Sequence, residues 1–182
     1  MVWAILNEDQ RAALGELIEG QKSDRIVSVI GGAILEDSLR RALELRMRPK
    51  DGNTDMNDKL FRVGGPLGNF GPKIDLGYQL YMFDKPYRNA MYGISEIRNL
   101  FAHNLSMTFA SGGPKMNTAL DKLALHVGQT HYQSALWEGD SAHIIEATDT
   151  AKDKILVNLK MCLLWLMLDN AKHQPWSNVP RR

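Results

Sequence analysis

The sequence predicts an all-α fold, a helical bundle of about four main helices with short extra helices. Apolar residues recur at three- and four-residue steps over several long segments, as in amphipathic helices. Capping residues precede these segments, and glycine or proline follows them. The chain has 182 residues, 44% of them apolar and 24% charged, which suits a single domain over residues 1–182.

The N-terminal part of the chain predicts two helices. A first helix is expected at about residues 8–19, where the acidic start "EDQ" suits a helix N-terminus. A longer helix over residues 23–48 would begin at Ser23 or Asp24 and stop before Pro49. The repeating apolar positions that we expect on its core face are Ile26, Val29, Ile30, Ala33, Ile34, Leu39 and Leu43.

The middle of the chain predicts two further helices. A polar loop over residues 49–59 and a glycine- and proline-rich connection over residues 64–72 lead to a helix at about residues 72–82. The next helix, at about residues 85–102, has Asp84 as its expected cap.

The C-terminal part begins with residues 105–110, which could form a short extended arm. A short helix is then expected at about residues 115–127, and a long closing helix at about residues 143–173. Cys162 lies in an apolar run of the closing helix, so we interpret it as a small core residue rather than a nucleophile.

Charge and cysteine content narrow the functional classes. The 22 lysine and arginine residues against 21 acidic residues give a net charge of +1, which supplies no overall attraction to nucleic acid. A single cysteine cannot form an internal disulfide, so we expect a reduced, cytoplasmic setting. No signal peptide and no membrane-spanning segment is predicted.

Metal and cofactor motifs are not evident. The glycines of "VIGGAILED" lack the lysine of a phosphate-binding Walker loop. Among the histidines, His126 and His131 have the only useful ligand spacing, and it is a weak signal. We therefore predict no metal and no cofactor.

The segment "GISEIRNLFAHNL", residues 93–105, carries the most informative polar residues. Arg98 and His103 are five positions apart, which turns their side chains about 140° away from each other on a regular helix. Either His103 lies beyond the helix end, or a second chain completes a site. A partly buried Arg98 needs an anionic partner, for which Glu36 and Asp37 are the candidates.

Two interpretations of this segment stay open. In the first, Arg98 forms a structural salt bridge and His103 caps the C-terminus of its helix. In the second, the segment cuts RNA without a metal ion. His103 would then take the proton of the 2′-hydroxyl, Arg98 would stabilise charge on the phosphoryl oxygens, and Asn99 or Asn104 would supply an amide.

A basic run, "SLRRALELRMRPK", is the best candidate for contact with phosphates. The alternative interpretation is the solvated face of a long helix. The arginines concerned are Arg40, Arg41, Arg46 and Arg48.

Residues 64–104, "GGPLGNFGPKIDLGYQLYMFDKPYRNAMYGISEIRNLFAHN", resemble the central signature of the mannitol operon repressor-like family. That signature is a Gly-Pro-Leu-Gly loop, an amphipathic helix, a turn, and a helix that ends in Ile-Arg-Asn-x-x-Ala-His. The segment "VIGGAILEDSLRRAL" resembles the preceding helix of the family, with acidic residues at Glu36 and Asp37. The similarity covers roughly residues 23–110. The turn "LYMFDKPYR" departs from the smaller, Leu-Gly-Leu-Ile-type ending of the pattern.

The family is similar to the wider HEPN superfamily of helical bundles, whose mark is an arginine, a polar residue and then a histidine after a total gap of four to six residues. Arg98, Asn99 and His103 fit this mark. The resemblance implies a homodimer and a regulator of transcription, acting through a protein partner or by direct contact with DNA. The alternative that it implies is a metal-independent endoribonuclease, a toxin or defence protein, that uses Arg98 and His103 on RNA.

Overall fold

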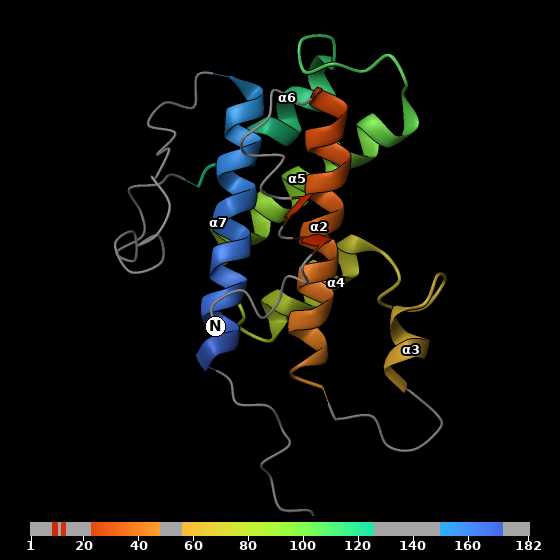
Figure 1. The fold of residues 1–182 in the computed structure, drawn as a ribbon, viewed down its shortest axis with the longest axis vertical. Coiled ribbons are helices and arrows are strands. Elements are labelled where there is room, and N and C mark those ends of the chain that lie inside the picture. The colour runs from red at the N-terminus through yellow and green to blue at the C-terminus, as the bar shows by residue number, and fades with distance from the viewer. Residues whose placement is uncertain (1–8, 11, 14–22, 48–55, 126–149, 173–182) are drawn as a thin grey trace, which may run out of the picture.

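The computed structural model describes the chain in five stretches, which form helices and turns with no strand among them (Figure 1). This confirms the predicted all-α class. The described residues are 9–10, 12–13, 23–47, 56–125 and 150–172. Their six bounded helices are α2 (Asp24–Glu44), α3 (Met56–Phe61), α4 (Phe70–Gln79), α5 (Lys85–His103), α6 (Gly113–Asp121) and α7 (Ala151–Lys172).

The three long helices α2, α5 and α7 pack against one another and form the body of the bundle (Figure 1). At the C-terminal ends of α2 and α7, Arg46 contacts Asp169, so these two helices run in the same direction. Arg25, at the start of α2, donates to the carbonyl of Phe101 at the end of α5, so α5 runs in the opposite direction. Helix α4 packs on α2 and α5, and α6 packs mainly on α5. No helix in the described stretches combines the length and the apolar character that crossing a membrane requires.

Helix α7 is buried along much of its length. Cys162 is fully buried, which confirms the prediction that it is a core residue, and burial raises the pKa of its thiol. The rings of Tyr87 and Trp165 lie 4.8 Å apart, and the indole N–H of Trp165 donates to the carbonyl of Met82. These contacts join α7 to α5 and to the turn before it.

The helix starts follow the predicted capping pattern in part. Ser23 caps α2 by accepting a hydrogen bond from the backbone N–H of Ile26, as expected. Asp84 stands at the N-cap of α5, but its side chain makes no capping hydrogen bond. Thr150 accepts from the backbone N–H of Asp153 at the start of α7.

Two predictions about local structure are wrong. A polar loop is expected over residues 49–59, but its described residues, from Met56 onward, belong to a short helix, α3, that continues to Phe61. Residues 105–110 form successive turns rather than an extended arm, with backbone hydrogen bonds from Met107 to Asn104 and from Ser111 to Thr108. Such i to i+3 bonds close the chain into turns, which an extended segment cannot form.

The predicted core face of α2 is correct only for some of its positions. Ile34, Leu39 and Leu43 are buried, whereas Ile26 and Ile30 are exposed. Ala33 is exposed as well. The apolar pattern therefore covers two surfaces of α2, one in the core and one open.

The remaining boundaries shift by a few residues. The helix expected at residues 72–82 begins earlier, at Phe70, and ends at Gln79. The short helix expected at residues 115–127 spans Gly113–Asp121. The rest of the predicted N-terminal helix, residues 143–149 and Arg48 lie outside the described residues.

The glycines before α4 make a tight structural turn. A Cβ atom on Gly65 would lie 2.5 Å from the carbonyl oxygen of Lys59, and one on Gly68 would lie 2.5 Å from that of Arg62. Larger residues would collide with backbone atoms at both places.

The turn after helix α4 contains a residue, Tyr81, in an unusual backbone conformation. Tyr81 has a φ of 55° and occupies the left-handed position that glycine normally takes after a helix, while the N–H of Met82 bonds to the carbonyl of Gly77. Tyr81 is 93% exposed. The turn between α4 and α5 thus displays an aromatic ring to solvent.

Candidate functional site

The Arg-Asn-x-x-Ala-His motif forms the last two turns of α5. The helix stays regular through His103, and Asn104 is its C-cap. Arg98 and His103 therefore project in different directions, as their spacing predicts. Asn99 and His103, four residues apart, share the exposed face of the helix.

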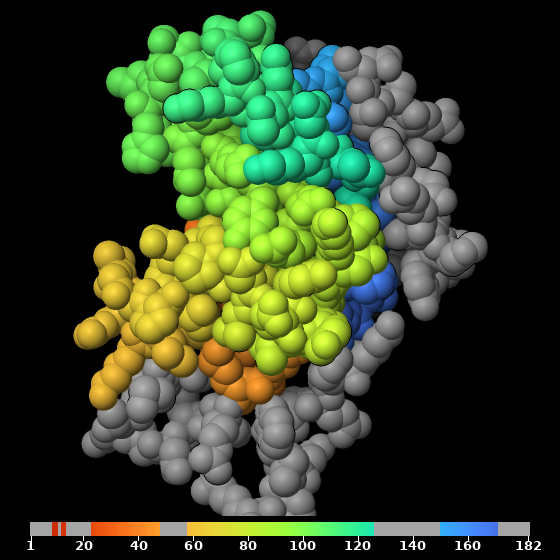
Figure 2. All heavy atoms as spheres, turned by 180° about the vertical axis from the view of Figure 1, so that it is seen from behind, coloured from red at the N-terminus to blue at the C-terminus, as the bar shows by residue number. Residues whose placement is uncertain are grey.

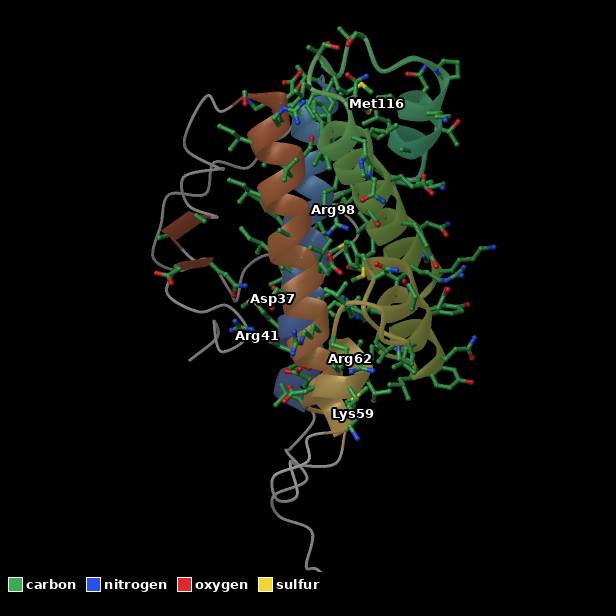
Figure 3. All side chains as sticks on the ribbon, turned by 90° about the vertical axis from the view of Figure 1, so that its right-hand side faces the viewer. Asp37, Arg41, Lys59, Arg62, Arg98 and Met116 are labelled. Carbon is green, nitrogen blue, oxygen red and sulfur yellow. The ribbon has the colours of Figure 1, made fainter. Side chains whose placement is uncertain are left out.

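Arg98 points from α5 toward α2, and a glycine makes room for it (Figure 3). A Cβ atom on Gly32 would lie 2.9 Å from Cδ and 3.0 Å from Cβ of Arg98. The absence of a side chain at Gly32 lets the aliphatic stem of the arginine lie against α2. The second glycine of "VIGGAILED" thus serves the packing of α5 on α2.

Arg98, Glu36 and Lys73 form a partly buried ionic cluster, which we call the triad. Glu36 Oε2 accepts a hydrogen bond from Arg98 Nη1, and Glu36 Oε1 lies 2.6 Å from Lys73 Nζ. The side chains of Lys73, Glu36 and Arg98 are 5%, 19% and 23% exposed. The guanidinium also lies over the ring of Phe70, 5.7 Å from its centroid. Three helices, α2, α4 and α5, therefore meet at one carboxylate.

Of the two acidic residues predicted to pair with Arg98, Glu36 makes the contact and Asp37 does not. Asp37 Oδ2 lies 3.0 Å from Nε of Arg41 and accepts a hydrogen bond from the side chain of Gln10. One residue turns a helix by 100°, so Asp37 faces away from α5.

The second amino group of Arg98, Nη2, is directed to Asn99. Its distance to Asn99 Oδ1 is 3.4 Å, which is long for a hydrogen bond. The triad thus reaches the exposed face of α5 through Arg98 and Asn99. His103 lies one turn further along that face, and no hydrogen bond or ion pair joins it to another described residue.

The C-terminal end of α5 is held by α2. Arg25 donates hydrogen bonds to the carbonyl oxygen of Phe101 and to the carbonyl oxygen of Asn104, the second at a distance of 2.5 Å. The neighbouring Asp24 accepts from the backbone N–H of Phe109 at 3.2 Å. The predicted capping role of His103 is therefore wrong, since Arg25 bonds the terminal carbonyls.

Asn104, the other candidate amide, serves its own turn. Its Oδ1 accepts hydrogen bonds from the backbone N–H and the hydroxyl of Ser106 at 3.2 Å and 3.0 Å. Asn99 is thus the amide that the structure places beside Arg98.

Three arginines of the basic run, Arg40, Arg41 and Arg46, pair with acidic side chains. Arg40 pairs with Glu44 at 2.9 Å and lies over the ring of Phe61. Arg41 pairs with Asp37. Arg46 contacts Asp169, the side chain of Asn170 and the carbonyl of Ala42. Arg40 and Arg41 thus form ion pairs within α2, and Arg46 joins the C-terminal ends of α2 and α7.

A second polar cluster, on the outer surface of α4 and α5, was not predicted. Arg88 lies 5.2 Å from the ring centroids of both Tyr78 and Tyr92, and its Nη2 is 2.7 Å from Asp75. The hydroxyl of Tyr92 also donates to Asp75 at 2.8 Å. The hydrogen bond from Arg88 lowers the pKa of Asp75. The pKa of Tyr92 is raised mainly by burial and secondly by its hydrogen bond to Asp75.

One side of the bundle is hollowed between α5 and the region of α3 and α4. Figure 2 shows an indentation between the green residues at the end of α5 and the yellow residues of α3 and α4, with a small part of α2 at its base. Figure 3 shows this side face on and places Arg98 midway along it, between α2 and α5. Among the described residues, no group of three histidine, cysteine or acidic side chains is arranged to hold a metal ion.

Lys73 and Arg25 are the site residues that sequence reasoning missed. The signal for Lys73 was a charged residue beside Ile74 in the apolar face of its helix. Arg25 gave no signal, because its partners are backbone carbonyls.

Comparison with family models, with curated proteins and with solved structures finds no match to this chain.

Proposed function

We propose that the chain is a cytoplasmic regulator of transcription, of the mannitol repressor-like kind, that acts through a protein partner. The observation that carries this proposal is the pairing of the basic run within the chain. Its described arginines, Arg40, Arg41 and Arg46, pair with acidic residues of the chain itself. Binding to DNA needs several cations that are not already paired with carboxylates of the same protein.

The exposed composition around the motif also suits a protein partner. Leu105, directly after α5, is a large apolar side chain that is 89% exposed. Exposed apolar groups around an arginine are typical of protein interfaces.

Transcript profiling and DNA binding test this proposal together. We expect deletion of the gene to raise a defined set of transcripts, and the wild-type gene to restore them. The purified protein should show no salt-sensitive binding to the promoter regions of those transcripts. Unchanged transcripts, or tight DNA binding that weakens steeply with salt, would contradict it.

A metal-independent endoribonuclease is the second candidate function. The observation that favours it is the exposed face of α5, where Asn99 and His103 lie one turn apart and Arg98 Nη2 is directed to Asn99. His103 could act as the base and Arg98 could bind the phosphate.

RNA cleavage in EDTA tests this second function. A ribonuclease of this kind would leave 2′,3′-cyclic ends, and His103→Ala would abolish the activity without loss of the fold. Cleavage that persists in His103→Ala would exclude His103 as the base.

A further inference from the structure

The triad carries one more positive than negative charge. Lys73 and Arg98 are both cationic side chains, and Glu36 is the one carboxylate that they share. The other carboxylates nearest in sequence or on the same helices are engaged elsewhere, Asp37 with Arg41 and Asp75 with Arg88. A surplus charge in a partly buried site is stabilised by an anion from outside.

Hydrogen-bond donors remain available at the open end of the triad. Nη1 of Arg98 is used by Glu36, but Nη2 has only the long contact with Asn99 Oδ1. Asn99 is exposed, and its amide nitrogen bonds to no described residue. A carboxylate in this position could accept from both groups, as arginine geometry favours.

The surroundings of the triad favour a single anionic side chain over a nucleic-acid backbone. A phosphodiester chain needs a row of available cations, whereas Arg40 and Arg41 of α2 and the neighbouring Arg46 are each paired with a carboxylate. Leu105, in the turn directly after α5, is an exposed apolar side chain. It would contact an apolar residue beside the anion on a folded or helical protein segment.

We propose that the indentation between α5 and the region of α3 and α4 is the docking site of the protein partner, with Arg98 and Asn99 binding an aspartate or glutamate side chain of that partner. This proposal rests on the proposed function, because it names the surface and the chemistry by which the partner is recognised. The surplus charge of the triad supplies the attraction, and the exposed side chain of Leu105 after α5 supplies apolar contact area.

Lys73 gives the proposal a sharp consequence. Lys73→Met removes the surplus charge but leaves the Arg98–Glu36 pair intact and balanced. Arg98→Gln removes the binding group and leaves the Lys73–Glu36 pair balanced. Both variants should therefore fold, and both should weaken binding of the anion. Arg88→Gln is the matched control, because Arg88 lies on the same helix with its own partner, Asp75.

Titration with acetate tests the anion site directly. In the full-length, nitrogen-15-labelled protein at constant ionic strength, acetate replacing chloride should shift the Arg98 Nε–H and Asn99 side-chain signals in a saturable way. In Lys73→Met the apparent dissociation constant should rise about tenfold, since a nearby positive charge is lost. Arg88→Gln should leave it unchanged. Absence of saturable shifts, or equal affinity in Lys73→Met, would overturn the proposal.

Photo-crosslinking in cells identifies the occupant. A benzoylphenylalanine at the exposed position Ala102 should capture a protein segment that contains an acidic residue, and Arg98→Gln should abolish the capture. The same probe at Asn117, on α6, is the control position. Capture of RNA, capture of a second copy of this chain, or no capture would each overturn the proposal. If the regulated transcripts stay at their wild-type level in Arg98→Gln, the docking proposal is overturned, while the proposed function still stands.

Discussion

At the scale of single residues, the position of Arg98 depends on the missing side chain of Gly32. The arginine stem fills the space that a Cβ atom at Gly32 would take, 2.9 Å from Cδ. This close approach brings the guanidinium within reach of Glu36 and of the ring of Phe70.

Gly32→Ala should therefore destabilise the protein by about 1–3 kcal/mol, because the added methyl group overpacks the contact between α2 and α5. Urea unfolding would measure the loss. Gly71→Ala is the matched control, since its Cβ would meet Tyr92 at 3.7 Å, an ordinary contact distance. Equal stability of Gly32→Ala and wild type would contradict the close packing of Arg98.

The two ends of the triad should respond differently to substitution. Glu36→Gln leaves two cations facing each other, so we expect a loss of about 2 kcal/mol or more. Lys73→Met leaves a balanced pair and should cost less than about 1 kcal/mol. The free energies of unfolding of both variants, measured in urea at neutral pH, give the comparison. The reverse order of stabilities would show that Glu36 does not join both cations.

The triad also shows what the sequence reveals at this scale. The need of a partly buried arginine for a carboxylate predicts Glu36, but not the choice between Glu36 and Asp37. That choice depends on the rotation of α2 about its axis, which packing against α5 decides. Lys73 becomes recognisable only when α4 is placed beside both helices.

At the scale of elements, the helices follow from apolar periodicity, and their ends are less predictable. The start of α2 at Ser23 is a local property of the capping residue. The end of α5 is fixed by Arg25, which is 76 residues away from Phe101 in the chain. The arm expected over residues 105–110 fails for the same reason, since Asp24 of α2 holds Phe109 within a series of turns.

The outer cluster on α4 and α5 gives an element-scale prediction with a pH dependence. The pKa of Asp75 is lowered by Arg88, so its charged form stabilises the folded state. That stability is present above the unfolded pKa of Asp75 and is lost as the pH falls through its lower, folded value. The side chain of Asp75 is 52% exposed, so Asp75→Asn should cost less than about 1 kcal/mol at pH 7.

Unfolding of Asp75→Asn and wild type across pH 2 to 7 measures this contribution. The stability difference should be largest at neutral pH and should vanish at the acidic end. A difference that stays constant down to pH 2 would mean that Asp75 acts by packing alone.

At the scale of the whole molecule, α2 carries two apolar side chains, Ile26 and Ile30, that lie outside the core of the described helices. The periodicity of α2 predicts a single core face, whereas the structure divides it between the core and an exposed strip with Ile26 and Ile30. Sequence pattern alone cannot separate these two, because a docking surface and a core have the same apolar composition.

The homodimer implied by the family resemblance stays a prediction. If it forms, sedimentation at micromolar concentration should give twice the mass of the 20.5 kDa chain. Sedimentation as a monomer would exclude it, and would leave the proposed site on α2 and α5 to be used by a different protein.

Transcript profiling of an Arg98→Gln strain is the most direct test of the central claim, that a protein partner recognised through Arg98 mediates transcription control. We expect Arg98→Gln to raise the same transcripts as gene deletion, and Arg88→Gln, on the same helix, to keep them at the wild-type level. Wild-type transcript levels in Arg98→Gln, with the protein folded and present in normal amount, would contradict it.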